Sequence, residues 1–195
     1  MKVGAVVLAA GKASRFGAPK QLLEIEGETL IDRACRTALD AGCEPVLRVL
    51  GAHAEAILQR PCPRLVETLV HAGWDEGMGS SLSAGVSDLL DRVPGLDAVL
   101  VMLADQPMVT VALFDEMKAR LRETGIVLCD HGEATGPPAL FAREHFGELL
   151  ALHGDRGAKA VAMNHDAALV AFADAAWDID SPEAWERFVA GRVES

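Results

Sequence analysis

The fold is decided first by residues 3–17, which read VGAVVLAAGKASRFG. Val3–Ala9 is apolar at almost every position, as expected of a strand that is covered on both faces within a parallel sheet. A loop with two glycines and several cations follows and extends to Lys20. A buried strand that opens into such a loop begins a βα unit, so this stretch predicts an α/β protein.

Downstream of this stretch, apolar segments of strand length alternate with segments of helical periodicity. The alternation is typical of βαβ units and predicts a mostly parallel sheet flanked by helices. Strands are expected at residues 45–50, 65–70, 98–103, 126–129 and 169–172. Helices are expected at residues 30–41, 54–59, 80–90, 110–122 and 143–152, after residue 155, and at residues 182–188.

The breaks between these elements are also marked in the sequence. Thr29 and Thr110 are the expected N-caps of the helices that follow them. Residues 74–79 are expected to form a loop, and the Gly136–Pro138 segment, which reads GPP, a turn. No repeat, linker or change of composition divides residues 1–195, so we expect a single domain.

Composition excludes several classes of function. The chain has 195 residues, of which half are apolar, and its formal net charge is −11. Such an acidic protein lacks the net positive charge that attracts nucleic acid or an anionic membrane. The longest apolar runs are too short to span a bilayer, and the cations of the glycine loop follow the first run too closely for a secretory signal. The four cysteines form no CxxC pair, so we expect reduced thiols and a cytoplasmic location.

The glycine loop is the first candidate binding element. Exposed N–H groups in a loop of this kind form an anion-binding concavity, and Arg15 offers a bidentate fork for phosphate. The loop is neither a Walker motif nor a GxGxxG fingerprint, since Gly11 and Gly17 stand six residues apart. On spacing alone, phosphate binding and an ordinary βα connection are both open.

Acidic residues supply the second element. Asp105 directly follows the expected strand at 98–103, at the sheet edge where open α/β folds bind ligands, although it could instead cap a turn. Asp178 and Asp180 precede Pro182, where helix capping is the simpler interpretation. Together with the cations of the loop, separated carboxylates for Mg²⁺ are the parts of a phosphoryl or nucleotidyl transfer site.

Residues 8–20 resemble the LAAGxSxRxGxxK pattern of nucleotidyltransferases with a GT-A-like, Rossmann-like fold. The more specific resemblance is to the molybdenum cofactor cytidylyltransferase family, which is related to the molybdenum cofactor guanylyltransferases. Further matching segments follow in order: Trp74 with GMGSSLSAG at 77–85, LADQP at 103–107, GPPALF at 136–141, GDRGAK at 154–159 and DIDSPE at 178–183. Each is weak by itself, but their order over nearly the whole chain is specific.

The resemblance implies a role for individual residues. The nucleotide would be bound by the backbone of four loop residues, by two cations, by a serine and by one carboxylate: Leu8, Ala9, Ala10, Gly11, Arg15, Lys20, Ser81 and Asp105. Arg15 would bind the leaving β- and γ-phosphates, Lys20 the α-phosphate, and Ser81 would help to fix the base. Asp105 would hold Mg²⁺, with Asp180, or alternatively Asp178, completing the metal site.

The implied reaction is Mg²⁺-dependent transfer of a cytidylyl group from CTP to the terminal phosphate of a molybdopterin-type cofactor, with release of pyrophosphate. Arg15, Lys20 and Asp105 would be the catalytic residues. A phosphate monoester is largely dianionic at neutral pH, so no protein base is required. The product would serve maturation of a molybdoenzyme, which with its maturation chaperone is an expected partner. The GDRGAK stretch would lie toward the acceptor.

Ala10 bears on which base is selected. Relatives that use GTP tend to have glycine here, so the methyl group would narrow the pocket and favour a pyrimidine; alternatively, Ala10 simply packs under the loop. Two departures from the family pattern matter for function. Phe16 replaces the usual Met, and Pro137 stands where relatives often have His, which puts an acceptor contact there in doubt.

Three other functions stay open at this point. A nucleotidyltransferase for a sugar or alcohol phosphate would have a similar loop and a similar Asp105. A non-catalytic molybdopterin carrier would not need Arg15, Lys20 and Asp105 together. A dinucleotide-binding module is disfavoured by the absence of GxGxxG.

Overall fold

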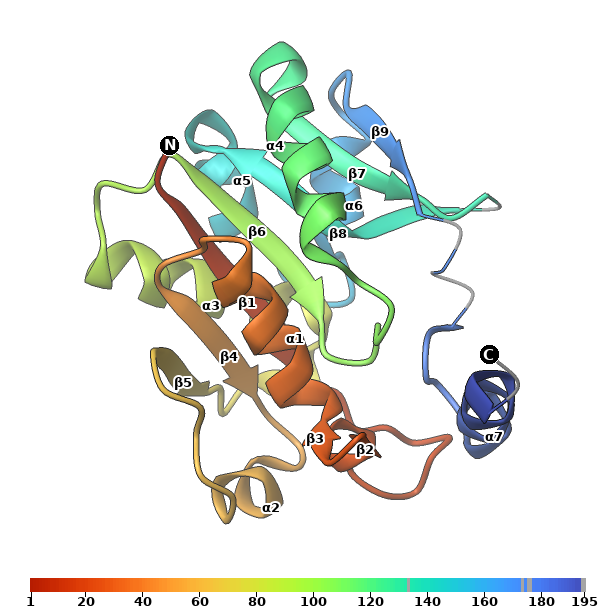
Figure 1. The fold of residues 1–195 in the computed structure, drawn as a ribbon. Coiled ribbons are helices and arrows are strands. Elements are labelled where there is room, and N and C mark those ends of the chain that lie inside the picture. Colours follow the sequence, from red (N-terminus) through yellow and green to blue (C-terminus); the bar gives the residue numbers. More distant parts are fainter. Residues whose placement is uncertain (133, 173, 175–176, 194–195) are drawn as a thin grey trace.

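The computed structural model describes residues 1–132, 134–172, 174 and 177–193. A seven-stranded sheet runs through the molecule in the order β5-β4-β1-β6-β8-β7-β9 (Figure 1). Its strands are β1 (Val3–Ala9), β4 (Val46–Leu50), β5 (Val66–Val70), β6 (Ala98–Leu103), β7 (Ile126–Asp130), β8 (Thr135–Ala142) and β9 (Ala168–Ala171). Among the described strands of this sheet, only β8 pairs antiparallel with its neighbours, so the predicted mostly parallel α/β fold is confirmed.

Helices cover both faces of this sheet. On one face lie α1 (Leu30–Asp40) and α4 (Val111–Thr124), and on the other lie α3 (Met78–Arg92), α5 (Phe146–Leu150) and α6 (Ala158–Ala162), as Figure 1 shows. Alternate side chains of β1 supply both cores: Ala5 and Val7 pack with α1 and α4, whereas Val6 and Leu8 pack with α3. All seven residues of β1 are buried, which is why its sequence is almost continuously apolar.

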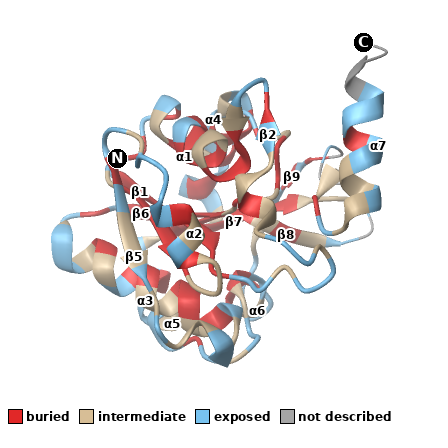
Figure 2. Cartoon of the chain, turned by 90° about the horizontal axis from the view of Figure 1, so that it is seen from below, coloured by how far each residue is buried: buried red, intermediate tan, exposed pale blue. Residues whose placement is uncertain are grey.

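Smaller elements complete the chain. They are the hairpin β2 (Glu24–Ile25) and β3 (Glu28–Thr29), the helix α2 (Ala54–Leu58), and the 3₁₀ turns η1 (Lys20–Leu22), η2 (Trp74–Glu76) and η3 (Arg143–His145). The last helix, α7 (Pro182–Val193), lies beside the main body and is largely exposed (Figure 2). It is attached through Phe188, which packs with Ile25, Leu30 and Ile179.

The expected helix starts are confirmed at two positions. The Thr29 hydroxyl accepts a hydrogen bond from the backbone N–H of Asp32, at 3.2 Å, and Thr110 accepts one from Leu113, at 3.3 Å. Other boundaries differ from the prediction by a few residues. The expected loop at residues 74–79 contains η2 and the first turn of α3, and the helix expected at residues 143–152 divides into η3 and α5.

The turn predicted at Gly136–Pro138 is wrong, because these residues belong to β8. Proline lacks the N–H that a strand ladder needs, which is why the sequence suggested a turn. The register between β7 and β8 jumps from Leu128 opposite Ala139 to Cys129 opposite Gly136. The two prolines therefore lie in a bulge where no ladder donor is required, and the strand continues through them.

None of the helices in the described residues is long and apolar enough to cross a membrane.

Candidate active site

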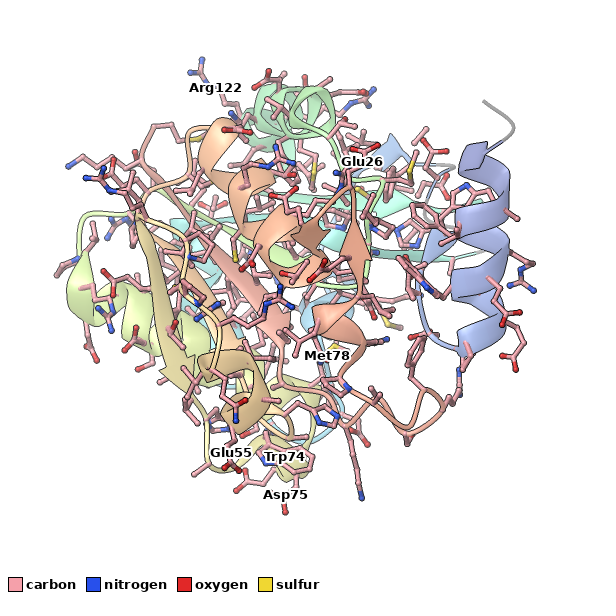
Figure 3. The ribbon with its side chains drawn as sticks, turned by 60° about the horizontal axis from the view of Figure 1, so that its bottom comes forward. Glu26, Glu55, Trp74, Asp75, Met78 and Arg122 are labelled. Atoms are coloured by element: carbon pink, nitrogen blue, oxygen red, sulfur yellow. The ribbon has the colours of Figure 1, made fainter. Side chains whose placement is uncertain are left out.

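A cleft of about 540 Å³ opens where β1 and β6 end. Five parts of the chain line it: the end of β1 with the loop after it, the end of β6, the entry to α3, Asp155, and the pair Asp178 and Asp180. Figure 3 shows Trp74 and Asp75 together at one edge of the molecule, at the end opposite Arg122. The lining residues are Leu8, Ala9, Ala10, Gly11, Lys12, Ala13, Ser14, Arg15, Lys20, Gln21, Trp74, Asp75, Gly77, Met78, Ser81, Leu103, Ala104, Asp105, Asp155, Asp178 and Asp180.

The loop after β1 turns sharply. Ala13 has φ of 48° and Gly17 has φ of 71°, and the Ala13 carbonyl accepts hydrogen bonds from the backbone N–H groups of Phe16 and Gly17. Ala13 stands at the position where the resembled pattern has serine; Ser14 follows it, and both line the cleft. A Cβ added to Gly11 would meet nothing within 4 Å, so the protein leaves open space over the backbone at that position.

The side chain of Gln21 anchors this loop through hydrogen bonds. Its side chain is buried, and Nε2 donates to the carbonyl oxygens of Ala9, at 3.1 Å, and Gly11, at 3.4 Å. Two amide hydrogens thus fix the end of β1 to the start of the loop. The sequence pattern did not single out this glutamine, and its place next to Lys20 was the one available signal.

Lys20 links two of the predicted metal ligands. Its Nζ lies 2.5 Å from Oδ2 of Asp105 and 2.7 Å from Oδ1 of Asp180, and the lysine side chain is only 13% exposed. Burial alone would lower the pKa of Lys20, but the two carboxylates outweigh it and raise the pKa above its ordinary value. An ammonium group therefore holds together carboxylates that are far apart in the sequence.

Asp178 lies in the same group of charges but is more enclosed. Burial, followed by repulsion from Asp105, raises the pKa of Asp178 to about 7, against a hydrogen bond from Gln106 that opposes the shift. Asp178 Oδ1 and Asp105 Oδ1 are both buried and have no hydrogen-bond partner within the part of the chain that the structure describes. Two carboxylate oxygens are thus available to a further cation or donor.

Ile179 determines where the two late aspartates lie. Its side chain is fully buried among Ile25, Leu30 and Phe188, and its backbone N–H donates to the carbonyl oxygen of Asp105 at 3.0 Å. Anchoring Ile179 brings its neighbours Asp178 and Asp180 to the cleft. The helix that follows is capped separately by Ser181, whose hydroxyl accepts from the backbone N–H of Ala184.

The entry to α3 closes another side of the cleft. Gly77 has φ of 120°, and a Cβ there would come within 2.4 Å of the backbone of Gly154, so only glycine fits. Gly79 donates its N–H to the Gly154 carbonyl at 2.7 Å. The GMGSSL segment is therefore docked on the GDRGAK segment, and Ser81 lies buried at the cleft wall.

All the residues predicted for the site line this one cleft. Leu8 and Ala9–Gly11 form its floor, and Arg15 is exposed at its rim with no ion pair among the described residues. Ala10 is also only 5% exposed, since it packs with the core around α3. Of the GDRGAK segment, Asp155 lines the cleft, whereas Arg156 lines a separate cavity of about 170 Å³.

The donor set of the cleft fits a divalent cation. Asp105, Asp178 and Asp180 supply only carboxylate oxygens, which are the ligands that Mg²⁺ and Mn²⁺ prefer. Two of these oxygens are buried and lack a partner, and the ammonium of Lys20 already lies between Asp105 and Asp180. The residues present therefore match the metal that the sequence pattern implied.

Residues 5–169 match the MobA-like NTP transferase domain. The chain belongs to this family. It is accordingly a nucleotidyltransferase, which agrees with a cleft that combines a glycine loop, cations and carboxylates at the ends of parallel strands.

Curated relatives of this MobA-like protein have several names. Purine catabolism protein PucB of Bacillus subtilis is 30% identical over 93% of this chain and 93% of that protein. Nicotine blue oxidoreductase of Paenarthrobacter nicotinovorans is 40% identical over 56% of this chain, and the match spans about half, 52%, of that relative. A probable molybdenum cofactor guanylyltransferase of Opitutus terrae is 32% identical over 68% of this chain and 62% of that protein, and the molybdenum cofactor cytidylyltransferase of Escherichia coli is 26% identical over 72% and 70%.

Solved structures share the whole fold of the MobA-like chain. Rv0371c of Mycobacterium tuberculosis superposes with a TM-score of 0.83 at 29% identity and covers 97% of this chain and 98% of its own. The same mycobacterial protein has been solved in complex with manganese, with a TM-score of 0.78 at 27% identity, covering 97% and 99%.

Proposed function

We propose that this nucleotidyltransferase transfers a cytidylyl group from CTP to the terminal phosphate of a molybdopterin-type cofactor. The observation that carries the proposal is that one cleft joins the open backbone of the glycine loop to Lys20 and to three carboxylates. Two relatives named as molybdenum cofactor nucleotidyltransferases support the acceptor class. The product would pass to a molybdoenzyme or to its maturation chaperone.

The loop after β1 is suited to bind the nucleotide. Backbone N–H and C=O groups at Leu8–Gly11 would contact the base and the first phosphates, and the open space over Gly11 supports a close approach there. Arg15, which is exposed at the rim, would bind the leaving β- and γ-phosphates through its planar fork. Ser81, on the opposite wall, would help to hold the base.

Lys20 would act on the α-phosphate. In the protein without substrate its charge is neutralised by Asp105 and Asp180. When a triphosphate enters, the ammonium would exchange one carboxylate for a phosphate oxygen, and the released carboxylate would become available to a cation. A preorganised donor of this kind lowers the barrier because it meets charge that grows in the transition state.

Asp105 and Asp180 would hold the divalent cation, with Asp178 as the alternative second ligand. A cation bound there would supply positive charge to offset the triphosphate and the leaving pyrophosphate. We propose Mg²⁺ as the physiological ion, and the manganese complex of Rv0371c supports a divalent metal at such a site. Burial raises the pKa of Asp178 to about 7, so that carboxyl group is only partly ionised at neutral pH, which favours Asp180 as the partner of Asp105.

The chemical step requires no protein base. An oxygen of the acceptor's terminal phosphate attacks the α-phosphorus of CTP, the bond from that phosphorus to the bridging oxygen breaks, and pyrophosphate leaves. The attacking group is already largely dianionic, since the second pKa of a phosphate monoester is about 6. The described residues that line the cleft include no His or Cys, in keeping with catalysis by positioning and charge.

Base selection is assigned to Ala10. Ala10 lines the cleft at the end of β1, where a larger purine would approach the same backbone, and most of its surface is buried in the core around α3. One methyl group discriminates by about 1–3 kcal/mol, so CTP should be preferred over GTP without excluding it. We further propose that the protein works in the cytoplasm, since all four cysteines are free thiols.

The test is pyrophosphate release by the purified protein with Mg²⁺, intact molybdopterin cofactor and each of the four nucleoside triphosphates. We expect turnover with CTP and a product whose mass has increased by a cytidylyl group. Turnover mainly with GTP would overturn the base assignment. Turnover only with sugar or alcohol phosphates would overturn the acceptor, and binding of the cofactor without any turnover would indicate a carrier. A parallel assay for redox turnover of nicotine blue tests the activity named for that relative.

A further inference from the structure

A cluster of two histidines and a glutamate lies at the opposite end of the sheet strands from the cleft. His145 ends η3, Glu148 belongs to α5, and His165 follows α6. The cluster is near the amino end of β6, because Ala142 pairs with Ala98 and the cleft is at the carboxyl end of that strand. None of the three residues lines the cleft.

The three side chains converge on one point. Glu148 Oε1 lies 3.1 Å from Nδ1 of His145 and 2.8 Å from Nε2 of His165. One ligand atom from each residue falls within 4.8 Å of the other two. The donor set is therefore two imidazole nitrogens and a carboxylate.

The second ring nitrogen of His145, Nε2, indicates that the cluster is suited to a cation. His145 is 7% exposed, and its buried Nε2 has no hydrogen-bond partner among the described residues and lies 3.6 Å from a carboxylate oxygen of Glu144. If Nδ1 carries the proton toward Glu148, Nε2 is a buried lone pair facing a carboxylate. If a cation replaces that proton, Nε2 carries the hydrogen and points it at Glu144, which is the usual outer partner of a metal-bound histidine.

From this geometry we propose that His145, Glu148 and His165 form a second metal site that binds a transition ion of the Zn²⁺ type. Imidazole nitrogens favour zinc and its neighbours, whereas the all-oxygen donor set of the cleft favours Mg²⁺ or Mn²⁺. Two histidines and one glutamate are a known zinc ligand set that leaves a fourth position for water. The partly exposed His165 provides the access from solvent.

The bound ion would link the two ends of one segment, residues 149–164. Residues 149–164 leave the cluster through α5, reach the cleft at Asp155, and return through α6 to His165. The Gly154 carbonyl accepts a hydrogen bond from the N–H of Gly79, so this segment supports the start of α3. A cation joining Glu148 to His165 would hold both ends of the segment that forms this wall of the cleft.

The test uses tag-free protein and Co²⁺ as a spectroscopic substitute for Zn²⁺, because imidazole ligands give bound Co²⁺ a distinctive visible spectrum. We expect one such site that excess Zn²⁺ displaces, and a rise in the melting temperature with Zn²⁺. His165→Gln and, independently, Glu148→Gln should abolish the signal and the shift. Glu144→Gln should weaken Zn²⁺ binding roughly 10–100-fold. His153→Ala is the matched control, since His153 is an exposed histidine outside the cluster.

Two results would overturn the site. One is a wild-type protein that shows no imidazole-type Co²⁺ spectrum, and the other is a His165→Gln or Glu148→Gln variant that keeps it. Circular dichroism without metal establishes that each variant is folded before its spectrum is compared. Full retention by His153→Ala together with loss in both cluster variants supports the proposal.

Discussion

Replacing Asp178 by Asn is predicted to stabilise the metal-free protein at alkaline pH. The pKa of Asp178 is raised to about 7 in the folded protein from an ordinary value of 3.8, because the carboxyl group is buried and faces Asp105. The folded state therefore holds a proton that the unfolded chain loses. The stability associated with that proton is fully present below about pH 3.8 and is lost as the pH rises through about 7.

The magnitude follows from the two pKa values. A difference from 3.8 to about 7 corresponds to about 4 kcal/mol, at 1.36 kcal/mol for each pKa unit. Asp178 is only partly buried, so solvent screening reduces the expected effect to about 2 kcal/mol. Asn has no charge to bury, so Asp178→Asn should recover this free energy at pH 8 and little of it at pH 4.5.

The assay is urea unfolding of both proteins at pH 4.5 and pH 8 in the presence of a chelator. The informative quantity is the change between the two pH values in the stability difference, since any constant effect of the amide cancels. Asp75→Asn, which alters an exposed carboxylate of the same cleft, is the control and should show little pH dependence. A stability difference for Asp178→Asn that does not change with pH, or that becomes less favourable at pH 8, would refute the reasoning.

Three further predictions concern catalysis. Lys20→Ala should raise the activation barrier by about 2–4 kcal/mol, seen as a lower kcat with little change in nucleotide affinity. The same variant should bind Mn²⁺ more tightly in the absence of nucleotide, because it frees Asp105 and Asp180. An unchanged kcat contradicts the catalytic role of Lys20. Asp105→Asn should abolish turnover at ordinary Mg²⁺ while circular dichroism stays native, and an active variant with a lowered melting temperature would make Asp105 structural. Ala10→Gly should reduce the ratio of kcat/KM for CTP over GTP by a factor that corresponds to about 1–3 kcal/mol, and an unchanged ratio would show that Ala10 only packs under the loop.

The sequence by itself determined the parts of this protein whose signals are local. Continuous apolar character identified β1 and β6, and hydroxyl caps identified the starts of α1 and α4. The loop at 8–20 and Asp105 were assigned to one site because the carboxyl ends of parallel strands meet at one edge of a sheet. These features depend on a few adjacent residues and on a general rule of topology.

Only the tertiary structure decided the features that depend on residues far apart in the chain. The prolines of β8 are tolerated because a bulge removes the need for their N–H, which depends on the register with β7. Lys20 meets Asp180 across 160 positions because Ile179 is buried beneath α7. His145 and His165 converge on Glu148 because α5 and α6 pack on the same face of the sheet. Contacts of this kind are products of packing, and no local pattern of residue types records them.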